Sequence, residues 1–206
     1  MATWHATLRD IGNQYRLVGL ITLLCLVLNA GDDAVRIALR YGRTEILDGE
    51  VWRLLTAHFV HLGWRHTLMN MAAWVLIWFI FRHAVSERTW LIAIVLCSLG
   101  VSAGLWFANS PLRWYVGFSG TLHGLFVLGA LTHARAGLHL ERGLLVLLAA
   151  KLGWEQWYGA MPGSAEFAGG NVVVDAHLYG ALTGLLIGLY AALKQRTGKA
   201  KPQIKS

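Results

Sequence analysis

Six long apolar segments, separated by short stretches that carry most of the charge, constrain this chain more than any other feature. They cover roughly residues 17–30, 66–81, 90–108, 119–134, 143–157 and 176–193. A helix that crosses a bilayer needs about 20 predominantly apolar residues. Hydrophobic residues make up 56% of the chain and charged residues only 14%. This composition excludes an ordinary soluble enzyme and a disordered chain, both of which carry more charge.

The apolar runs favour helices over a membrane β-barrel, whose strands alternate polar and apolar residues. The chain has only three prolines and no visible internal repeat. We therefore predict an all-α polytopic membrane protein, in which residues 1–206 form one domain with six transmembrane helices. We expect residues 31–65 to form a long outer loop. Residues 158–173 are rich in Gly, Ala and Ser, and are expected to form a flexible link.

The distribution of basic residues predicts the orientation in the membrane. Eleven of them fall on one side of the six spans: Arg9, Arg16, Arg82, Arg88, Arg135, Arg142, Lys194, Arg196, Lys199, Lys201 and Lys205. Six fall on the other side: Arg36, Arg40, Arg43, Arg53, Arg65 and Arg113. Because cytoplasmic segments carry the excess of basic residues, both termini and the basic tail 194–206 are predicted to be cytoplasmic.

Three other interpretations of the composition are disfavoured. The net charge of the chain is +7, and many of its basic residues lie in the tail or in pairs between apolar runs. This distribution is typical of a membrane surface rather than of nucleic-acid binding. Cys25 and Cys97 each lie inside an apolar run, so both are interpreted as small apolar residues rather than as a disulfide. Leu28, three residues before a candidate cleavage point, argues against a cleaved signal peptide in residues 1–30.

Polar residues inside apolar spans are costly, so each is a candidate functional residue. They are His66, Asn70, Ser119, His123, Lys151, Glu155 and His177. Counted from the basic residue that ends each span, His66 and Ser119 lie 16 residues away and His177 lies 17 residues away. At about 1.5 Å per residue this is ~24–25 Å. Three separate spans thus bring these side chains to one depth, as a single buried site requires.

Glycines surround Ser119 and follow His177. Gly117 and Gly120 flank Ser119 and allow a sharp turn into a helix. The unpaired N–H groups at such a helix start suit a developing oxyanion. Small residues follow His177 at every fourth position, namely Gly180, Gly184 and Gly188. Each feature alone also fits helix packing or a structural histidine, but their combination at one depth favours a catalytic site.

These stretches resemble the rhomboid family of intramembrane serine proteases. The similar stretches are Trp52-Arg53, His61, His66-x-x-x-Asn70, Gly117-Phe118-Ser119-Gly120 and Ala176-His177-x-x-Gly180-x-x-x-Gly184, spread over about two thirds of the chain. Finer features are similar to the rhombosortase branch: residues 116–124, the Glu155-Gln156 pair and residues 174–180. The resemblance implies a rhomboid-like bundle of six helices.

The resemblance also implies roles for the site residues. Ser119 would be the nucleophile and His177 the general base, together forming a dyad. His66, Asn70 and the backbone N–H of Ser119 would stabilise the oxyanion. Trp52 and Arg53 would brace the outer loop, and the remaining motif positions would be structural: Gly117, Gly120, Gly180 and Gly184.

The sequence departs from many rhomboids at His123, where those proteins have a tyrosine that stacks on the catalytic histidine. An imidazole can also stack on His177 and support it. It is at the same time a rival base, because Ser119 and His123 lie four residues apart on one helix face. Asp175 is not assigned as a third catalytic residue, because two positions along a helix turn it ~200° away from His177.

Lys151 and Glu155 lie at i and i+4 of the fifth span, a spacing that favours a structural ion pair. Glu155 near the substrate entry is the alternative interpretation. No cofactor or metal is predicted: His61 and His66 are five residues apart, and no His-Glu-x-x-His sequence occurs.

The similarity implies a protease that cleaves a membrane-anchored protein within the phospholipid bilayer, near the outer, periplasmic face of a bacterial inner membrane. A rhombosortase would remove a C-terminal anchor built from a Gly-Gly-like motif, an apolar span and a basic end. Water or another nucleophile would accept the new terminus. Two other functions stay open: a non-catalytic rhomboid-like protein that binds membrane clients, and a proton-coupled transporter that uses His66, His123 and His177 as a relay.

Overall fold

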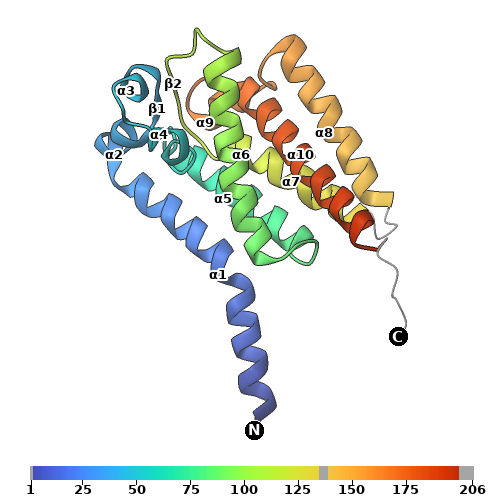
Figure 1. The fold of residues 1–206 in the computed structure, drawn as a ribbon. Coiled ribbons are helices and arrows are strands. Elements are labelled where there is room, and N and C mark those ends of the chain that lie inside the picture. Colours follow the sequence, from blue (N-terminus) through green and yellow to red (C-terminus); the bar gives the residue numbers. More distant parts are fainter. Residues whose placement is uncertain (1, 135–138, 200–206) are drawn as a thin grey trace.

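The computed structural model describes residues 2–134 and 139–199, and these residues are almost entirely helical (Figure 1). The six long helices are α1 (Ala2–Ala30), α5 (Trp64–Phe81), α6 (Glu87–Ala108), α7 (Ser119–Ala134), α8 (His139–Tyr158) and α10 (Val174–Lys199). The short elements are α2 (Asp32–Leu39), β1 (Tyr41–Gly42), α3 (Arg43–Leu47), α4 (Arg53–Thr56), β2 (Trp114–Tyr115) and α9 (Ser164–Ala168). Each predicted apolar segment therefore lies within one long helix.

Length and apolar composition identify fewer than six of these helices as candidate membrane spans. Among the described residues, Glu87–Ala108 and Val174–Lys194 are each long and apolar enough to cross a membrane, with mean hydropathies of 2.2 and 1.5. Tyr15–Ala30 and Asp32–Leu39 pass the same criterion as a pair bent by 116°. With 16 residues, α7 is shorter than the ~20 that a full span needs. The six-span arrangement stays a prediction.

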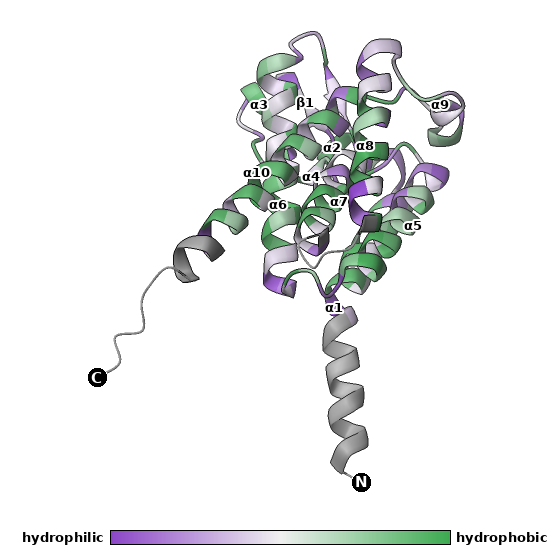
Figure 2. Cartoon of the chain, turned by 90° about the vertical axis from the view of Figure 1, so that its right-hand side faces the viewer, coloured by the Kyte–Doolittle hydropathy of each residue, from purple (hydrophilic) through white to green (hydrophobic). Residues whose placement is uncertain are grey.

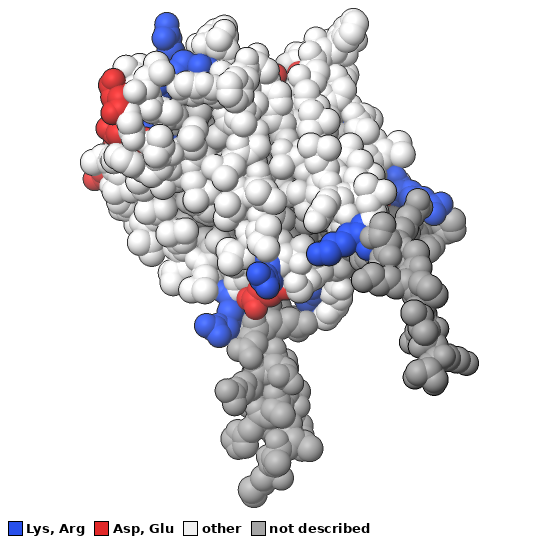
Figure 3. All heavy atoms as spheres, viewed as in Figure 1, with Lys and Arg blue, Asp and Glu red and all other residues white. Residues whose placement is uncertain are grey.

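The surface nevertheless has the distribution expected next to lipid. Green, apolar residues dominate the long helices in Figure 2, and purple residues collect toward the connecting segments. On the face drawn in Figure 3, charged side chains lie at the two ends of the bundle and a broad uncharged band separates them. The beginning of α1 and the end of α10 lie at the same end of the bundle (Figure 1).

Two connecting segments are more ordered than predicted. The outer loop contains α2, β1, α3 and α4, and β1 pairs antiparallel with β2 from the segment between α6 and α7, so that Tyr41 faces Tyr115. The predicted flexible link contains α9, whose two flanking glycines, Gly163 and Gly169, have φ angles of 78° and 77°. Glycine adopts this left-handed conformation without strain, so these residues turn the chain at both ends of a short helix.

The predicted tail also begins later than expected. Helix α10 continues to Lys199, five residues beyond the predicted start of the tail at Lys194. The other end of the tail, residues 200–206, lies outside the described residues, as does Arg135.

Arg53 is buried, and its guanidinium links separate parts of the outer loop by hydrogen bonds. Its Nε donates to Glu50 Oε2 at 2.7 Å, and its Nη1 donates to the carbonyl oxygens of Ile37 and Arg40 at 2.7 and 3.0 Å. A single guanidinium thus joins α4 to the end of α2. Trp52, the other residue of the predicted bracing pair, is half exposed at 51%.

A chain of buried polar groups holds the start of α7 against α4 and α6. His58 Nε2 lies 3.0 Å from Ser102 Oγ, which donates to the Leu54 carbonyl at 2.6 Å. Thr121 Oγ1, on α7, lies 3.4 Å from His58 Nδ1 and 3.0 Å from Ser98 Oγ. Burial lowers the pKa of His58 to about 4, so the imidazole is neutral. Satisfied buried networks of this kind specify one arrangement of the helices around them.

Candidate active site

Ser119 and His177, which lie 58 positions apart in the sequence, meet in the middle of the fold. Ser119 is the first residue of α7, and its Oγ lies 3.0 Å from Nε2 of His177, near the start of α10. His177 is 5% exposed. A hydroxyl and an imidazole nitrogen at this distance have the geometry in which the imidazole can remove the hydroxyl proton.

Glycines bring these two helices close enough for that contact. A Cβ added to Gly180 would overlap the carbonyl of Gly120, and one added to Gly184 would overlap the carbonyl of Gly124. A Cβ on Gly120 itself would lie 2.7 Å from the Ala176 carbonyl oxygen. Gly180 and Gly184 of the predicted stripe therefore pack backbone against backbone on α7, as small residues allow, whereas Gly188 faces the Leu131 side chain.

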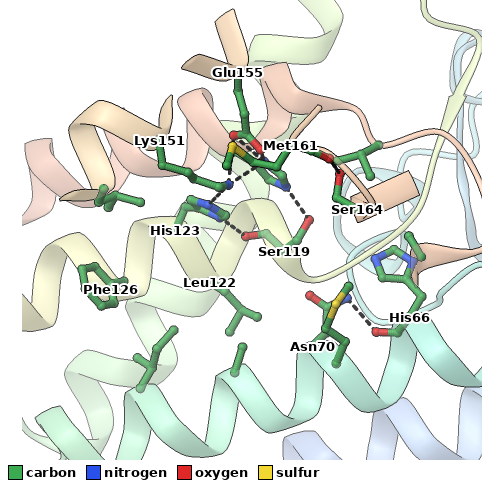
Figure 4. Close-up of a pocket in the computed structure, with 17 residues that line it drawn as sticks. His66, Asn70, Ser119, Leu122, His123, Phe126, Lys151, Glu155, Met161 and Ser164 are labelled. Atoms are coloured by element: carbon green, nitrogen blue, oxygen red, sulfur yellow. Dashed lines mark hydrogen bonds and ion pairs between the residues drawn. The ribbon is translucent and has the colours of Figure 1, made fainter. Parts of the chain in front are cut away.

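The other nitrogen of His177 faces a carboxylate. His177 Nδ1 lies 3.1 Å from Glu155 Oε1 and 2.9 Å from Glu155 Oε2. Glu155 comes from α8 and is 3% exposed. Lys151, one turn earlier on the same helix, donates to Glu155 Oε2 at 2.9 Å, and its Nζ lies 3.2 Å from His177 Nδ1 (Figure 4).

His123 stacks on His177, with 4.2 Å between the ring centroids and 15° between the ring planes. Its Nδ1 lies 2.7 Å from the Ser119 carbonyl oxygen, and its Nε2 lies 2.7 Å from Lys151 Nζ. The carbonyl only accepts and the ammonium only donates. His123 is therefore a neutral imidazole with hydrogen on Nδ1, and both of its nitrogens are engaged.

His66 and Asn70 lie together on α5, on the opposite side of Ser119 from His123 and Lys151 (Figure 4). The backbone N–H of Leu62 donates to His66 Nδ1 at 3.4 Å, so the neutral ring carries its hydrogen on Nε2 and can donate from there. Asn70 Nδ2 donates to the His66 carbonyl at 3.0 Å. Gly117, with φ of 121°, passes close to the imidazole: a Cβ there would lie 2.8 Å from His66 Cε1.

Two cavities share Ser119 and His66 in their walls. The first, about 340 Å³, is lined by the candidate polar residues and by apolar side chains of α5, α7 and α8, including Ile77, Leu122, Phe126 and Leu148. The second, about 470 Å³, lies between residues 111–116 and residues 168–173. A polypeptide that passed from one cavity to the other would pass directly over Ser119.

One cluster among the described residues has the composition of a metal site. His123, Glu155 and His177 each offer one ligand atom, and these atoms lie within 4.8 Å of one another. The ammonium of Lys151, however, already lies within 3.2 Å of a nitrogen or oxygen of all three residues. The three residues already surround the positively charged Lys151 side chain. A metal ion would therefore have to displace the Lys151 ammonium.

Sequence reasoning missed the position of Glu155 relative to His177. We had interpreted Lys151 and Glu155 as a structural ion pair, and the pair exists, but its carboxylate also contacts the candidate base. The available signal was a carboxylate inside an apolar span, which is costly unless a partner is present. Asp175, which we did not assign to the site, instead accepts a hydrogen bond from Asn109.

Comparison with known proteins shows the family. The family model described as Rhomboid domain matches residues 48–194. The chain belongs to the rhomboid family. It is 29% identical to rhomboid protease GlpG of Salmonella typhi over 204 residues, which are 93% of this rhomboid and 68% of the relative. It is also 29% identical over 174 residues to a protein of the same name from Salmonella newport (strain SL254), with 81% of this rhomboid and 58% of that relative covered.

The family match places this rhomboid among intramembrane serine endopeptidases, in agreement with the resemblance found from its motifs. The matched region begins just before Trp52 and ends within α10, at Lys194, so it contains every candidate site residue.

Proposed function

We propose that this rhomboid is a serine protease in which Ser119 is the nucleophile and His177 the general base. The observation that carries the proposal is the 3.0 Å contact between Ser119 Oγ and His177 Nε2 at the junction of two cavities. His123, the rival base, donates through Nδ1 to the Ser119 carbonyl and accepts at Nε2 from Lys151. Neither of its nitrogens is free to take a proton from Ser119.

In the first step of the proposed reaction, the Ser119 hydroxyl proton passes to His177 Nε2 while Oγ forms a bond to the carbonyl carbon of the scissile peptide. The electron pair of the carbonyl moves onto its oxygen. When the oxyanion collapses, the carbon–nitrogen bond breaks and the imidazolium returns its proton to the leaving amine. Water, or another nucleophile, then attacks the acyl ester and gives its proton to His177. The bond between the acyl carbon and Ser119 Oγ breaks, and the imidazolium returns the proton to Oγ, which restores the free serine and neutral histidine.

His66 Nε2, the Asn70 amide and the backbone N–H of Ser119 are proposed to stabilise the oxyanion. Donors placed in advance where charge develops are worth more in a site without water than in solution. Asn70 Nδ2 is occupied by the His66 carbonyl in the absence of substrate. The amide has a second N–H that can point to the oxyanion, because an asparagine side chain carries two donors.

Asn70→Ala is expected to lower the rate of labelling by a fluorophosphonate about 10²–10³-fold, which is the usual cost of one lost oxyanion donor. Measurable labelling should persist, since His66 and the backbone N–H remain. Ser119→Ala, in contrast, should not label at all. If a folded Asn70→Ala variant were as inert as Ser119→Ala, a shared oxyanion site would be the wrong description.

We further propose that the six long helices cross the bacterial inner membrane with both termini in the cytoplasm. The uncharged band between the charged ends of the bundle supports this arrangement, as does the excess of basic residues near the termini. Ser119 and His177 lie at or near the starts of α7 and α10, and the other ends of these two helices lie toward the side of the termini (Figure 1), so the site would open toward the periplasmic side.

The proposed substrate is a secreted protein held in the membrane by a C-terminal anchor with a Gly-Gly-type motif. The finer similarity to rhombosortases supports this choice, and so does the mainly apolar lining of the first cavity, which suits part of a membrane span. Two glycines without side chains could take an extended path between the cavities over Ser119.

A defined substrate tests this function. It would carry a soluble reporter, a Gly-Gly motif, an apolar span and a basic end, and it would be placed in lipid vesicles together with the rhomboid. We expect cleavage near the Gly-Gly motif by the native chain and none by Ser119→Ala, with mass spectrometry to locate the new terminus. Equal cleavage of a Val-Val substrate would contradict the proposed motif, and cleavage by Ser119→Ala would contradict the serine mechanism.

A further inference from the structure

Lys151 and Glu155 form a charged pair that the proposed dyad does not use. Glu155 is 3% exposed, and the carboxylate contacts both Lys151 Nζ and His177 Nδ1 at 2.9 Å. Burying a carboxylate is costly unless it is well paired and hydrogen-bonded. An ion pair that served only to support α8 could lie on an exposed face of the helix at little cost. The position of the Glu155 carboxylate beside His177 therefore needs another explanation.

We propose that Glu155 is the positioning residue of a Ser119–His177–Glu155 relay, and that Lys151 holds the Glu155 carboxylate ionised and in place. The proposal rests on the serine protease function proposed above and deepens it, because it turns the expected dyad into three residues joined by hydrogen bonds. Among the described residues, the hydrogen bonds and ion pairs of the Glu155 carboxylate go to His177 and Lys151, so we assign it a role through the base rather than on substrate.

Glu155 selects the useful form of the His177 ring. An ionised carboxylate can only accept hydrogen bonds. Both Glu155 oxygens lie closer to His177 Nδ1, at 3.1 and 2.9 Å, than the Lys151 ammonium does, at 3.2 Å, so we assign to Nδ1 a hydrogen that it donates to Glu155. The lone pair of the neutral ring then lies on Nε2, 3.0 Å from the Ser119 hydroxyl. Without an acceptor at Nδ1 the ring could place its hydrogen on Nε2, where it would be unable to take the serine proton. The carboxylate also stabilises the imidazolium that forms when the proton moves.

Lys151 acts on both neighbours of His177. Its ammonium balances the charge of Glu155 and, through His123 Nε2, holds the stacked imidazole in the form whose Nδ1–H donates to the Ser119 carbonyl. Ammonium groups carry no lone pair, so Lys151 cannot compete for the serine proton. Among the described residues, His177 is then the base whose ring nitrogen lies within hydrogen-bonding distance of Ser119 Oγ and can take its proton.

The fold contains a matched control for Glu155. Glu141, also on α8 and also 3% exposed, accepts a hydrogen bond from His133 Nδ1 at 2.9 Å. It lies 14 residues before Glu155, which is ~21 Å along the helix. Both sites pair a buried carboxylate on α8 with a histidine of another helix, His133 being partly exposed at 31% and His177 buried, but only Glu155 lies beside the histidine that contacts Ser119.

The test compares Glu155→Gln with Glu141→Gln in the full chain, using a fluorophosphonate probe and separating its binding constant KI from its reaction rate kinact. We expect kinact of Glu155→Gln to fall about 10²–10⁴-fold; the upper value is the loss found when the carboxylate of a serine–histidine–carboxylate set is neutralised. KI should change less than about threefold, because Glu155 does not touch the probe. Glu155→Asp, which keeps the charge, should recover part of the rate, and Glu141→Gln should keep kinact within about threefold of native.

A double variant distinguishes loss of the Glu155 contact with His177 from misfolding caused by an unpaired buried charge. Glu155→Gln leaves the buried Lys151 ammonium without its counterion, whereas Lys151→Met combined with Glu155→Gln removes both charges. We expect the double variant to melt near the native temperature and to label as slowly as Glu155→Gln. Labelling of either variant within about threefold of the native rate would overturn the proposal. Failure of the serine mechanism itself would look different: the native chain would not label, or Ser119→Ala would label equally.

Discussion

Replacement of His177 by alanine is expected to abolish the Ser119-dependent reaction while the chain still folds and inserts. A serine hydroxyl is a weak nucleophile until a neighbouring base takes its proton, and His177 Nε2 lies 3.0 Å from Ser119 Oγ. When residues act as one catalytic unit, removal of the base lowers the reaction rate about 10⁴–10⁶-fold. Fluorophosphonate labelling of the purified variant, with its melting temperature measured in parallel, checks this result.

His123→Phe is the matched comparison, because it keeps an aromatic ring for stacking on His177 and removes both ring nitrogens. The loss of rate should be much smaller than in His177→Ala, since His123 Nε2 is engaged by Lys151. Near-native labelling by a folded His177→Ala variant would transfer the role of base to His123.

Gly184→Leu is expected to lower both stability and activity, although it changes no catalytic side chain. Any side chain at Gly184 would overlap the Gly124 carbonyl, so α10 has to move away from α7. Overpacking of a tight contact costs about 1–3 kcal/mol or more. Because His177 and Ser119 come from these two helices, a shift of about 1 Å between them can cost about 10²-fold in rate.

Leu189→Ala serves as the control for this prediction, because Leu189 lies on the same helix but is 48% exposed. It should lower the melting temperature and the labelling rate much less than Gly184→Leu. A native melting temperature and a native rate in Gly184→Leu would contradict the packing of the glycine stripe on α7.

The sequence predicted the helices and the shared depth of the site because both depend on local spacing. Apolar runs define the helices, and a rise of about 1.5 Å per residue sets the depth of His66, Ser119 and His177. The glycine stripe predicted a close neighbour for α10, and the structure confirms that packing on α7. A turn of about 100° per residue also correctly separated Asp175 from the face that carries His177.

What the sequence did not predict depends on how helices rotate against one another. The spacing of Lys151 and Glu155 gives an ion pair on α8, but it does not say that this face of α8 turns toward His177. The short helix α9 was missed for a different reason: Gly163 and Gly169, interpreted as signs of flexibility, turn the chain at its ends. Glycine allows left-handed backbone in an ordered turn as readily as in a mobile link.

The most direct test of the central claim is to locate the covalent adduct that a fluorophosphonate forms with the full chain in detergent. Peptide mass spectrometry should find the phosphonyl group on Ser119 Oγ of the native chain and find no adduct in Ser119→Ala. His177→Ala should carry the same adduct only at a greatly reduced rate. An adduct on another residue, or undiminished labelling of Ser119→Ala, would contradict the assignment of Ser119 as the nucleophile.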